Sequence, residues 1–251
     1  MTPDETLAYL DAQVDAAAKL GFPVARYQHL AGPDVIRRLL PKAERLGVKL
    51  GLEIHSPEKV NSPTVLKYRE MYAKEKSPYL GFIPDFGSAA RRVSPAFLDY
   101  CRELALPEAL TAIAVELWQA DDDPADPRSQ KVAAFQARAK AAGFPAGDME
   151  EYFIIFGLFC RQEPRAWLEI MPQVVHIHGK FYHFAADRSE SSIPYEEILP
   201  VFVKAGYDGF MSSEWEGHAF SDRDSFAMVQ QHHALCARIL AAAYAKAPSA
   251  G

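Results

Sequence analysis

Apolar positions along the chain recur with two alternating periods, one typical of helices and one typical of buried strands. Before Gly21, apolar residues return every three or four positions, which is the spacing of one face of a helix. A strand-like run at 23–30 follows, and then come a helical stretch at 33–46 and an apolar run at 48–54. Helices that end at glycine and lead into apolar strands are typical of a parallel sheet with crossover helices.

The same alternation continues through the rest of the chain and predicts about five parallel strands with outer helices. The later elements are a helix at 63–74, strands at 80–85 and 174–180, a helix at 194–205, a strand at 209–214 and a closing helix at 222–246. Strands that alternate with helices in this way indicate the α/β fold class.

The stretch between residues 95 and 170 departs from this alternation because it is mostly helical. Its helical segments are expected at 95–104, 107–119, 129–142 and 148–171, with an acidic loop at 121–126. Residues 112–118 also fit a strand, although Glu116 and the flanking leucines fit a helix better. We therefore expect one partial barrel domain over residues 1–251, with a helical insertion at about 95–170.

The length of the chain limits how much of a closed barrel it can form. An eight-stranded α/β barrel typically needs ~250 residues and opens on a strand. This chain has 251 residues, opens on a helix and devotes about 75 residues to the insertion. We therefore expect the first strands of the barrel to be missing, which would leave an open sheet with an exposed edge at 23–30.

Four of the strand-like runs end in side chains that bind metals. Side chains alternate along a strand, so His176 and His178 share one face of the run at 174–180, with His178 nearer its carboxyl end. The other three runs end in Glu53, Asp85 and Glu214. In parallel α/β folds the chemistry sits at the carboxyl ends of the strands, so these side chains are expected to converge. His176 lies a layer deeper and is expected to be structural.

A divalent cation would explain why three carboxylates gather at one place. Neighbouring carboxylates raise one another's pKa unless a cation neutralises them. Mostly oxygen donors with one imidazole favour Mn²⁺ or Mg²⁺ over a structural zinc ion. Each residue alone would more often be a surface, salt-bridge or core residue, but four on successive strand ends favour a metal. The predicted ligands are Glu53, Asp85, His178 and Glu214.

Two further residues lie beside the predicted ligands and are candidates for catalysis. His55 shares a face with Glu53, and an imidazole with a pKa near ~6.5 can act as a general base. The alternative is that His55 supports the ligands from behind or lies exposed in a loop. Lys180 follows His178 on the same face, where it would polarise a carbonyl or bind a hydroxyl unless it is a solvated lysine.

The segment after Glu214 supplies candidates for substrate binding. Glu216 and His218 continue past the predicted ligand and are expected to line the pocket. Trp215 would contribute to an apolar wall for a ring, although aromatic residues near a barrel mouth are often only packing. The other candidates for this wall are Phe181, Tyr182 and Phe184.

Composition and charge narrow the class of protein. Apolar residues make up 49% and charged residues 24% of the chain, as in a globular protein. The formal net charge of −6 favours neither nucleic acid nor an anionic membrane as a partner. There is no apolar run long enough to cross a bilayer, and the N-terminus is typical of an acidic helix rather than a signal peptide. Three widely spaced cysteines favour buried thiols over a disulfide, so we expect a cytoplasmic protein.

Short motifs around the predicted ligands resemble a known superfamily. They are Leu-Glu-Ile-His at 52–55, Pro-Asp-Phe-Gly at 84–87, His-Ile-His-Gly-Lys-Phe at 176–181 and Ser-Glu-Trp-Glu-Gly at 213–217. Together they resemble the xylose-isomerase-like TIM barrels, whose metal ligands come from the last four strands. The Glu-x-His and His-x-His-x-Lys-Phe forms most resemble the metal-binding α subunit of C-glycoside deglycosidases, which implies that His55 is the base. The resemblance spans residues 23–218, and the first three strands have no counterpart.

The resemblance implies a metal-dependent enzyme that removes a proton next to a carbonyl of a sugar or glycoside. The outcome would be isomerisation, epimerisation or a lyase reaction, including C-deglycosylation of a 3-oxo-glycoside. These outcomes share the proton-abstraction step, so the sequence does not separate them. The alternative from another class is a non-catalytic metal-binding subunit of a larger complex. A hetero- or homo-oligomeric partner is expected in either case. A DNA-cleaving enzyme of this superfamily would need a basic surface, which the acidic net charge does not favour.

Overall fold

The computed structural model describes residues 1–120 and 127–246, and its strands form one parallel array in sequence order. Strands β1, β2 and β3 pair side by side in one sheet, and β4 pairs with β5 in a second. Bridges between Phe82 and Val174 and between Asp85 and His178 join the two sheets. The five strands are Val24–Tyr27, Lys49–Ile54, Leu80–Pro84, Ile177–Phe181 and Met211–Trp215. The predicted α/β class, with about five parallel strands, is confirmed.

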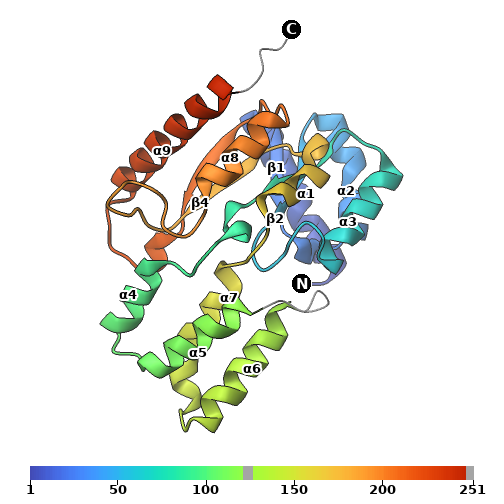
Figure 1. Ribbon diagram of the computed structural model, residues 1–251. Helices are drawn as coiled ribbons and strands as arrows, with labels where there is room; N and C mark the ends of the chain where they lie inside the picture. Colours follow the sequence, from blue (N-terminus) through green and yellow to red (C-terminus); the bar gives the residue numbers. More distant parts are fainter. Residues whose placement is uncertain (121–126, 247–251) are drawn as a thin grey trace.

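Helices cover the array from two sides (Figure 1). The helices beside β1–β3 are α1 (Pro3–Leu20), α2 (Pro33–Leu46) and α3 (Pro63–Glu75), and those beside β4–β5 are α8 (Tyr195–Lys204) and α9 (Ser225–Lys246). The first of these helices begins at a capping box, in which Thr2 and Glu5 each accept a hydrogen bond from the other's backbone N–H. It ends at Gly21, whose φ of 77° suits glycine.

The insertion extends away from the strands as a group of helices (Figure 1). It contains α4 (Pro95–Glu103), α5 (Glu108–Gln119), α6 (Pro127–Ala141) and the short α7 (Ile155–Leu158). The helix at 112–118 is confirmed, and the helical stretch expected at 148–171 is confirmed in part. It consists of the 3₁₀ segment Ala146–Ile154, α7 and the 3₁₀ turn Pro164–Glu169, with residues 159–163 outside any helix. The last turn begins at Pro164, which lacks the N–H needed to continue an α-helix. The acidic loop expected at 121–126 lies outside the described residues.

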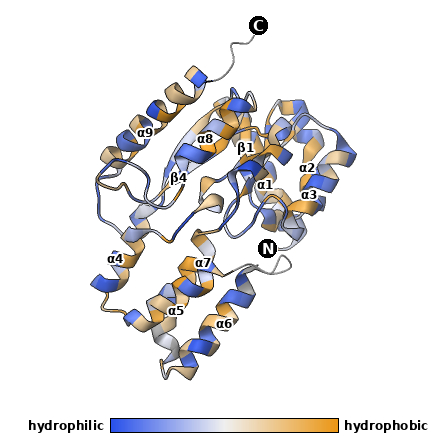
Figure 2. Cartoon of the chain, viewed as in Figure 1, coloured by the Kyte–Doolittle hydropathy of each residue, from blue (hydrophilic) through white to orange (hydrophobic). Residues whose placement is uncertain are grey.

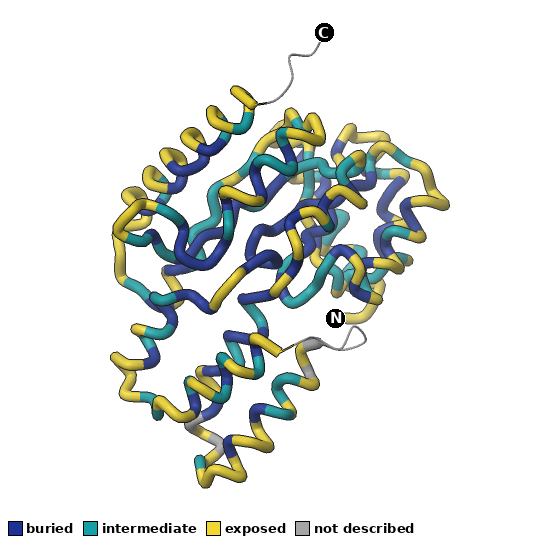
Figure 3. The backbone as a smooth tube through the Cα atoms, in the orientation of Figure 1, coloured by how far each residue is buried: buried dark blue, intermediate teal, exposed yellow. Residues whose placement is uncertain are grey.

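The core lies around β2 and β3, whose side chains are buried on both faces, as expected for a parallel sheet. Buried positions gather around the strands, and exposed ones follow the outer turns of the helices (Figure 3). The outer helices carry both apolar and polar positions (Figure 2). Val175 packs inside the array against two glycines: a Cβ at Gly81 would lie 2.3 Å from its Cγ1, and one at Gly51 3.3 Å from its Cγ2.

The array is open, and both of its outermost strands lack a second partner among the described residues. β1 pairs only with β2, and Arg26 on it is exposed, as predicted for this edge. β5 pairs only with β4 and is half-buried, an open edge that the sequence did not predict. The single domain over 1–251 and the missing first strands stay predictions.

Two expectations from composition can be compared with the described residues. The cysteines Cys101, Cys160 and Cys236 are buried, and they form no disulfide in this part of the chain. Within residues 1–120 and 127–246, no helix combines the length and apolar character that a membrane span requires.

Candidate metal centre

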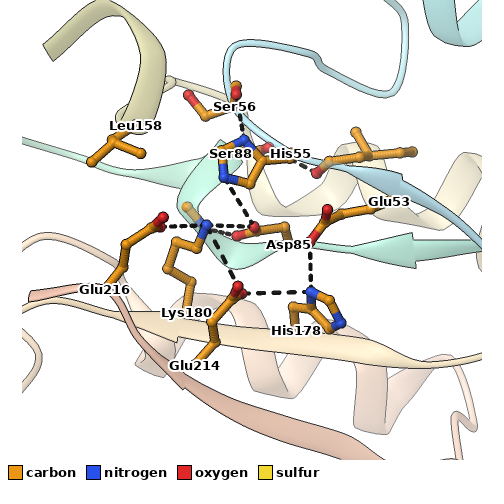
Figure 4. Close-up of polar contacts among 12 residues, drawn as sticks. Glu53, His55, Ser56, Asp85, Ser88, Leu158, His178, Lys180, Glu214 and Glu216 are labelled. Atoms are coloured by element: carbon orange, nitrogen blue, oxygen red, sulfur yellow. Dashed lines mark hydrogen bonds and ion pairs between the residues drawn. The ribbon is translucent and has the colours of Figure 1, made fainter. Parts of the chain in front are cut away.

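Four acidic or imidazole side chains meet at the carboxyl ends of four neighbouring strands. They are Glu53 on β2, Asp85 directly after β3, His178 on β4 and Glu214 on β5 (Figure 4). One potential ligand atom from each lies within 4.8 Å of the corresponding atoms of the other three. The structure therefore brings together the four residues that the sequence picked out as ligands. Glu53 and Asp85 are buried, and His178 and Glu214 are half-buried.

The two oxygens of Glu53 have different partners. Oε1 accepts a hydrogen bond from Nδ1 of His178 at 2.6 Å, and Oε2 forms an ion pair with the guanidinium of Arg26 on β1. Burial alone would raise the pKa of Glu53, but His178 and Arg26 outweigh burial and lower it to about 2. Burial would likewise lower the pKa of His178, but the surrounding carboxylates raise it. The cluster thus stabilises positive charge.

Asp85 is held in place by the turn that follows β3. Its Oδ1 caps the 3₁₀ turn Phe86–Ala89 by accepting a hydrogen bond from the backbone N–H of Gly87 at 2.8 Å. Its Oδ2 is left to face the cluster. This division is set by the local sequence, because an aspartate at a strand end can cap the turn and still present its second oxygen.

Lys180 is buried among carboxylates instead of being solvated, which rules out one of the alternatives left open by the sequence. Its side chain is 1% exposed, and its Nζ lies 2.8 Å from Oδ2 of Asp85 and 2.5 Å from Oε2 of Glu216. Oε2 of Glu214 is 3.9 Å away. Burial would lower the pKa of Lys180, but Asp85 and Glu216 raise it above the ordinary value. The ammonium group therefore stays charged.

The donor set fits a hard divalent cation. Oε2 of Glu214 is buried, accepts no hydrogen bond from the described residues and lies 3.9 Å from the Lys180 ammonium, whereas Oδ2 of Asp85 forms an ion pair with that ammonium at 2.8 Å. Burial and the charge of Asp85 raise the pKa of Glu214, which means that the nearby cations do not fully offset these two effects. Three carboxylates and one imidazole are ligands that Mn²⁺ and Mg²⁺ accept. Glu53, Asp85, His178 and Glu214 could therefore hold such an ion.

His55 presents one ring nitrogen to this cluster. Its Nδ1 lies 2.5 Å from the backbone oxygen of Ser56, and a carbonyl oxygen can only accept, so Nδ1 carries the proton. In the neutral ring Nε2 is then unprotonated, and it faces Oδ2 of Asp85 at 3.8 Å. The side chain is 25% exposed, so His55 is not the freely exposed loop histidine considered from the sequence. A cavity of about 390 Å³ opens beside Glu53 and His55.

The residues expected to bind substrate have different surroundings. Glu216 is 22% exposed and contacts the cluster through Lys180. Trp215 donates its indole N–H to the backbone oxygen of Tyr182 at 3.1 Å. His218 is exposed and contacts the backbone oxygen of Trp215, and none of its described contacts is with the four clustered residues. The substrate-binding roles of these residues stay predictions.

The other aromatic candidates make packing contacts, and His176 contacts a serine hydroxyl. Phe181 is buried and stacks on His232 of α9, with ring centroids 4.4 Å apart. Tyr182 is also buried and packs against Phe159 of the insertion. The expected apolar wall is therefore mainly core. His176 lies 2.7 Å from the hydroxyl of Ser212, in line with a structural role.

Arg26 is the functional candidate that the sequence did not reveal. It lies on the edge strand β1 with its side chain 47% exposed, yet it contacts the buried carboxylate of Glu53. Its place in a short strand-like run carries no spacing signal. Only the pairing of β1 with β2, in which Arg26 lies opposite Gly51, brings it within reach.

Comparisons with known proteins agree on one family, although no family model matches the chain. The chain is 38% identical over 244 residues to the C-glycoside deglycosidase alpha subunit of Arthrobacter globiformis, covering 96% of this chain and 68% of that protein. It is 38% identical over 245 residues to the 3'-dehydrocarminate deglycosidase alpha subunit of Microbacterium sp, covering 95% of this chain and 70% of that protein.

Solved structures with some similarity include an epimerase-like protein and a xylose isomerase-like barrel. One is a D-tagatose 3-epimerase-like protein, with 15% identity, a TM-score of 0.48 and coverage of 96% of this chain and 70% of that one. Another is a xylose isomerase-like TIM barrel protein from Mycobacterium smegmatis in complex with magnesium, with 14% identity, a TM-score of 0.46 and coverage of 96% and 68%. The family resemblance predicted from the motifs is confirmed by the relatives in sequence, and the chain belongs to the family of C-glycoside deglycosidase alpha subunits.

Proposed function

We propose that this chain is the metal-binding catalytic subunit of an enzyme that removes the C-linked aglycone from a 3-oxo-glycoside. The observation that carries the proposal is the position of His55, whose Nε2 lies 3.8 Å from Oδ2 of Asp85 in the four-residue cluster while its Nδ1 contacts the backbone oxygen of Ser56. The names of the relatives, which are deglycosidase alpha subunits, support the same reaction class. Isomerisation and epimerisation begin with the same proton abstraction and are the alternative reactions.

The reaction begins at the carbon beside the sugar carbonyl. Loss of its proton leaves an electron pair that moves toward the carbonyl oxygen and gives an enolate. When the carbonyl re-forms, the bond between the neighbouring sugar carbon and the aglycone breaks, a sugar C=C bond forms, and the aglycone carbon takes up a proton. We propose Glu53, Asp85, His178 and Glu214 as ligands of Mn²⁺ or Mg²⁺. When bound, the ion would supply Lewis-acid stabilisation of the developing negative charge.

His55 would act as the base. Ser56 holds its Nδ1–H, so the ring can take a proton only at Nε2. The imidazolium that results would be stabilised by the carboxylate of Asp85, which lies on that side of the ring. The same Nε2–H could then deliver the proton to the departing aglycone carbon, which returns His55 to its starting state.

Lys180 would stabilise the negative oxygen of the enolate. Glu216 and Asp85 hold its ammonium group in a buried position, where a charge acts more strongly than it would in water. Gly87 provides room for the lysine stem, since a Cβ there would lie 2.8 Å from Cδ of Lys180. A fixed ammonium group close to the cluster requires little reorganisation during the reaction.

We also propose that the chain works with a second, different subunit. The relatives are called alpha subunits, which supports a hetero-oligomer. The open edge of β5 supports this too, because Glu214 on that strand is 37% exposed and a partner could cover it. A cytoplasmic location is proposed from the sequence alone.

The test is turnover of a 3-oxo C-glycoside of a phenol by the purified protein, alone and with the proposed second subunit. Metal is removed by chelation and restored with Mn²⁺, and its content is measured by mass spectrometry. We expect aglycone release that disappears with the metal and returns with it, and no release from the glycoside that has not been oxidised. Stoichiometric Mn²⁺ binding without any turnover in either preparation would identify a non-catalytic metal-binding subunit instead.

A further inference from the structure

The cavity beside the metal cluster lies between the strand ends and the inserted helices. It measures about 390 Å³ and is lined at one end by Glu53 and His55. Its other end is formed by α6 and by the segment that runs into α7. A ligand whose sugar oxygens reached the cluster would therefore extend past His55 toward the insertion.

The wall contributed by the insertion is apolar and anchored. Phe153, Ile154 and Leu158 line the cavity and are half-buried, whereas their neighbours Ile155 and Phe156 are buried in the core. The backbone oxygen of Leu158 accepts a hydrogen bond from the hydroxyl of Tyr182 at 2.7 Å, which ties α7 to the loop after β4. Figure 4 shows Leu158 on the same side of the cluster as Ser56. This hydrogen bond thus fixes Leu158 relative to the end of β4.

One cationic side chain completes this wall. Arg128, near the start of α6, lines the cavity and makes no hydrogen bond or ion pair with any residue that the structure describes. Its guanidinium lies over Gly157, where a Cβ would be 3.4 Å from Nη2. In contrast, Arg138 on the same helix is paired with Glu116 at 2.7 Å and is not among the residues that line this cavity. The charge of Arg128 is therefore available to a ligand.

We propose that this cavity is the aglycone subsite and that Arg128 recognises an acidic substituent, a carboxylate or phenolate, on an aromatic aglycone. This inference rests on the proposed function. The insertion lines one side of the cavity with apolar side chains, and polar residues that include Gln28 and His29 line the rest. Such a mixed lining, with a volume within the usual range for ligands, fits a flat ring system that carries polar substituents. A guanidinium binds a carboxylate through two parallel hydrogen bonds and so adds specificity for an acidic substituent.

The first test compares two 3-oxo C-glycosides whose aglycones differ only in a carboxylate. Arg128→Gln should lower kcat/KM for the carboxylate-bearing substrate roughly ten- to hundredfold, mainly through KM, and leave the neutral substrate nearly unchanged. Arg138→Gln, the control on the same helix, should leave both unchanged. An equal effect of Arg128→Gln on both substrates, or no effect on either, would overturn the assignment of Arg128.

A second measurement separates failure of this inference from failure of the proposed function. Binding of 2-naphthoate and of neutral 2-naphthol is measured by calorimetry at pH 7, with Mn²⁺ present. Naphthoate should bind wild type more tightly than Arg128→Gln, while naphthol should bind both equally. If this difference appears but no C-glycoside is turned over, the role of Arg128 in binding an acidic aromatic ligand is supported and the proposed reaction is wrong. Turnover without the difference would contradict the subsite alone.

Discussion

The guanidinium of Arg26 holds one oxygen of the Glu53 carboxylate, and His178 donates a hydrogen bond to the other oxygen. Arg26 comes from the edge strand β1 and Glu53 from β2, so the contact crosses between neighbouring strands. It fixes which oxygen of this buried carboxylate faces the cluster. Contacts of this kind orient metal ligands, and their loss typically weakens metal binding.

Replacing Arg26 should therefore reduce metal affinity. Arg26→Met should weaken Mn²⁺ binding roughly tenfold, because Glu53 would lose the contact that fixes its orientation. Calorimetric titration of metal-free protein measures this change. Arg38→Met is the matched control, since Arg38 on α2 forms an exposed ion pair with Asp4 on α1. Tighter Mn²⁺ binding by Arg26→Met would mean that Arg26 competes with the ion.

Replacing Lys180 should destabilise the metal-free protein. Its side chain is 1% exposed, and the carboxylate of Asp85 beside it is fully buried. Lys180→Met would leave that carboxylate without its cation, and breaking a buried pair costs about 3–5 kcal/mol of unfolding free energy. Chemical denaturation without metal measures this loss.

Added metal should reverse part of that loss. Mn²⁺ binds the folded state, so saturating Mn²⁺ should raise the stability of Lys180→Met more than that of wild type. Lys42→Met, which removes a lysine paired with Asp11 and Asp15 on the surface helices, should show a smaller loss and no extra gain with Mn²⁺. Equal stability of Lys180→Met and wild type without metal would rule out this account of Lys180.

His232 should make stability depend on pH below neutrality. It is fully buried, lies 2.7 Å from the hydroxyl of Ser213, and burial lowers its pKa to about 4. In the unfolded chain its pKa is about 6.5, so between these values the unfolded state binds more protons. Stability from neutral His232 is therefore present above pH ~6.5 and is lost as pH falls toward 4.

The comparison with His232→Asn isolates this contribution. From pH 7 to pH 4 the unfolding free energy of wild type should fall relative to the variant, by on the order of 3 kcal/mol. Glu190, whose pKa burial raises to about 7, gives the opposite slope, but it is present in both proteins and cancels. Denaturant titrations at both pH values measure the difference. Parallel pH profiles would show that His232 does not titrate as described.

The sequence was sufficient to find the four clustered side chains because their positions depend on simple periodicities. Strand side chains alternate, and parallel strands present their carboxyl ends at one edge, so Glu53, Asp85, His178 and Glu214 could be placed together without coordinates. The same reasoning placed Lys180 on the correct face. It could not show that Lys180 is buried, because that depends on contacts with Asp85 and Glu216, which follow β3 and β5.

Features set by long-range packing were not predictable. Arg26 reaches Glu53 only through the register of β1 on β2, and the cavity beside His55 exists only because the insertion folds over it. The stretch at 148–171 has an apolar pattern that suggested helix, but it consists of 3₁₀ segments and the short α7, interrupted at residues 159–163 before Pro164. Local sequence patterns do not show which distant residues hold such segments in place. Here the hydroxyl of Tyr182 donates a hydrogen bond to the backbone oxygen of Leu158 in α7.

The most direct test of the account is turnover of a 3-oxo C-glycoside by His55→Asn, with bound Mn²⁺ measured in the same sample. Glu53 and the other predicted ligands are unchanged, so the variant should bind as much Mn²⁺ as wild type. Its turnover should fall by roughly 10²–10⁴, the usual contribution of a positioned general base. Turnover near the wild-type rate, with Mn²⁺ content confirmed, would contradict His55 as the base and shift that role to another group in the cluster.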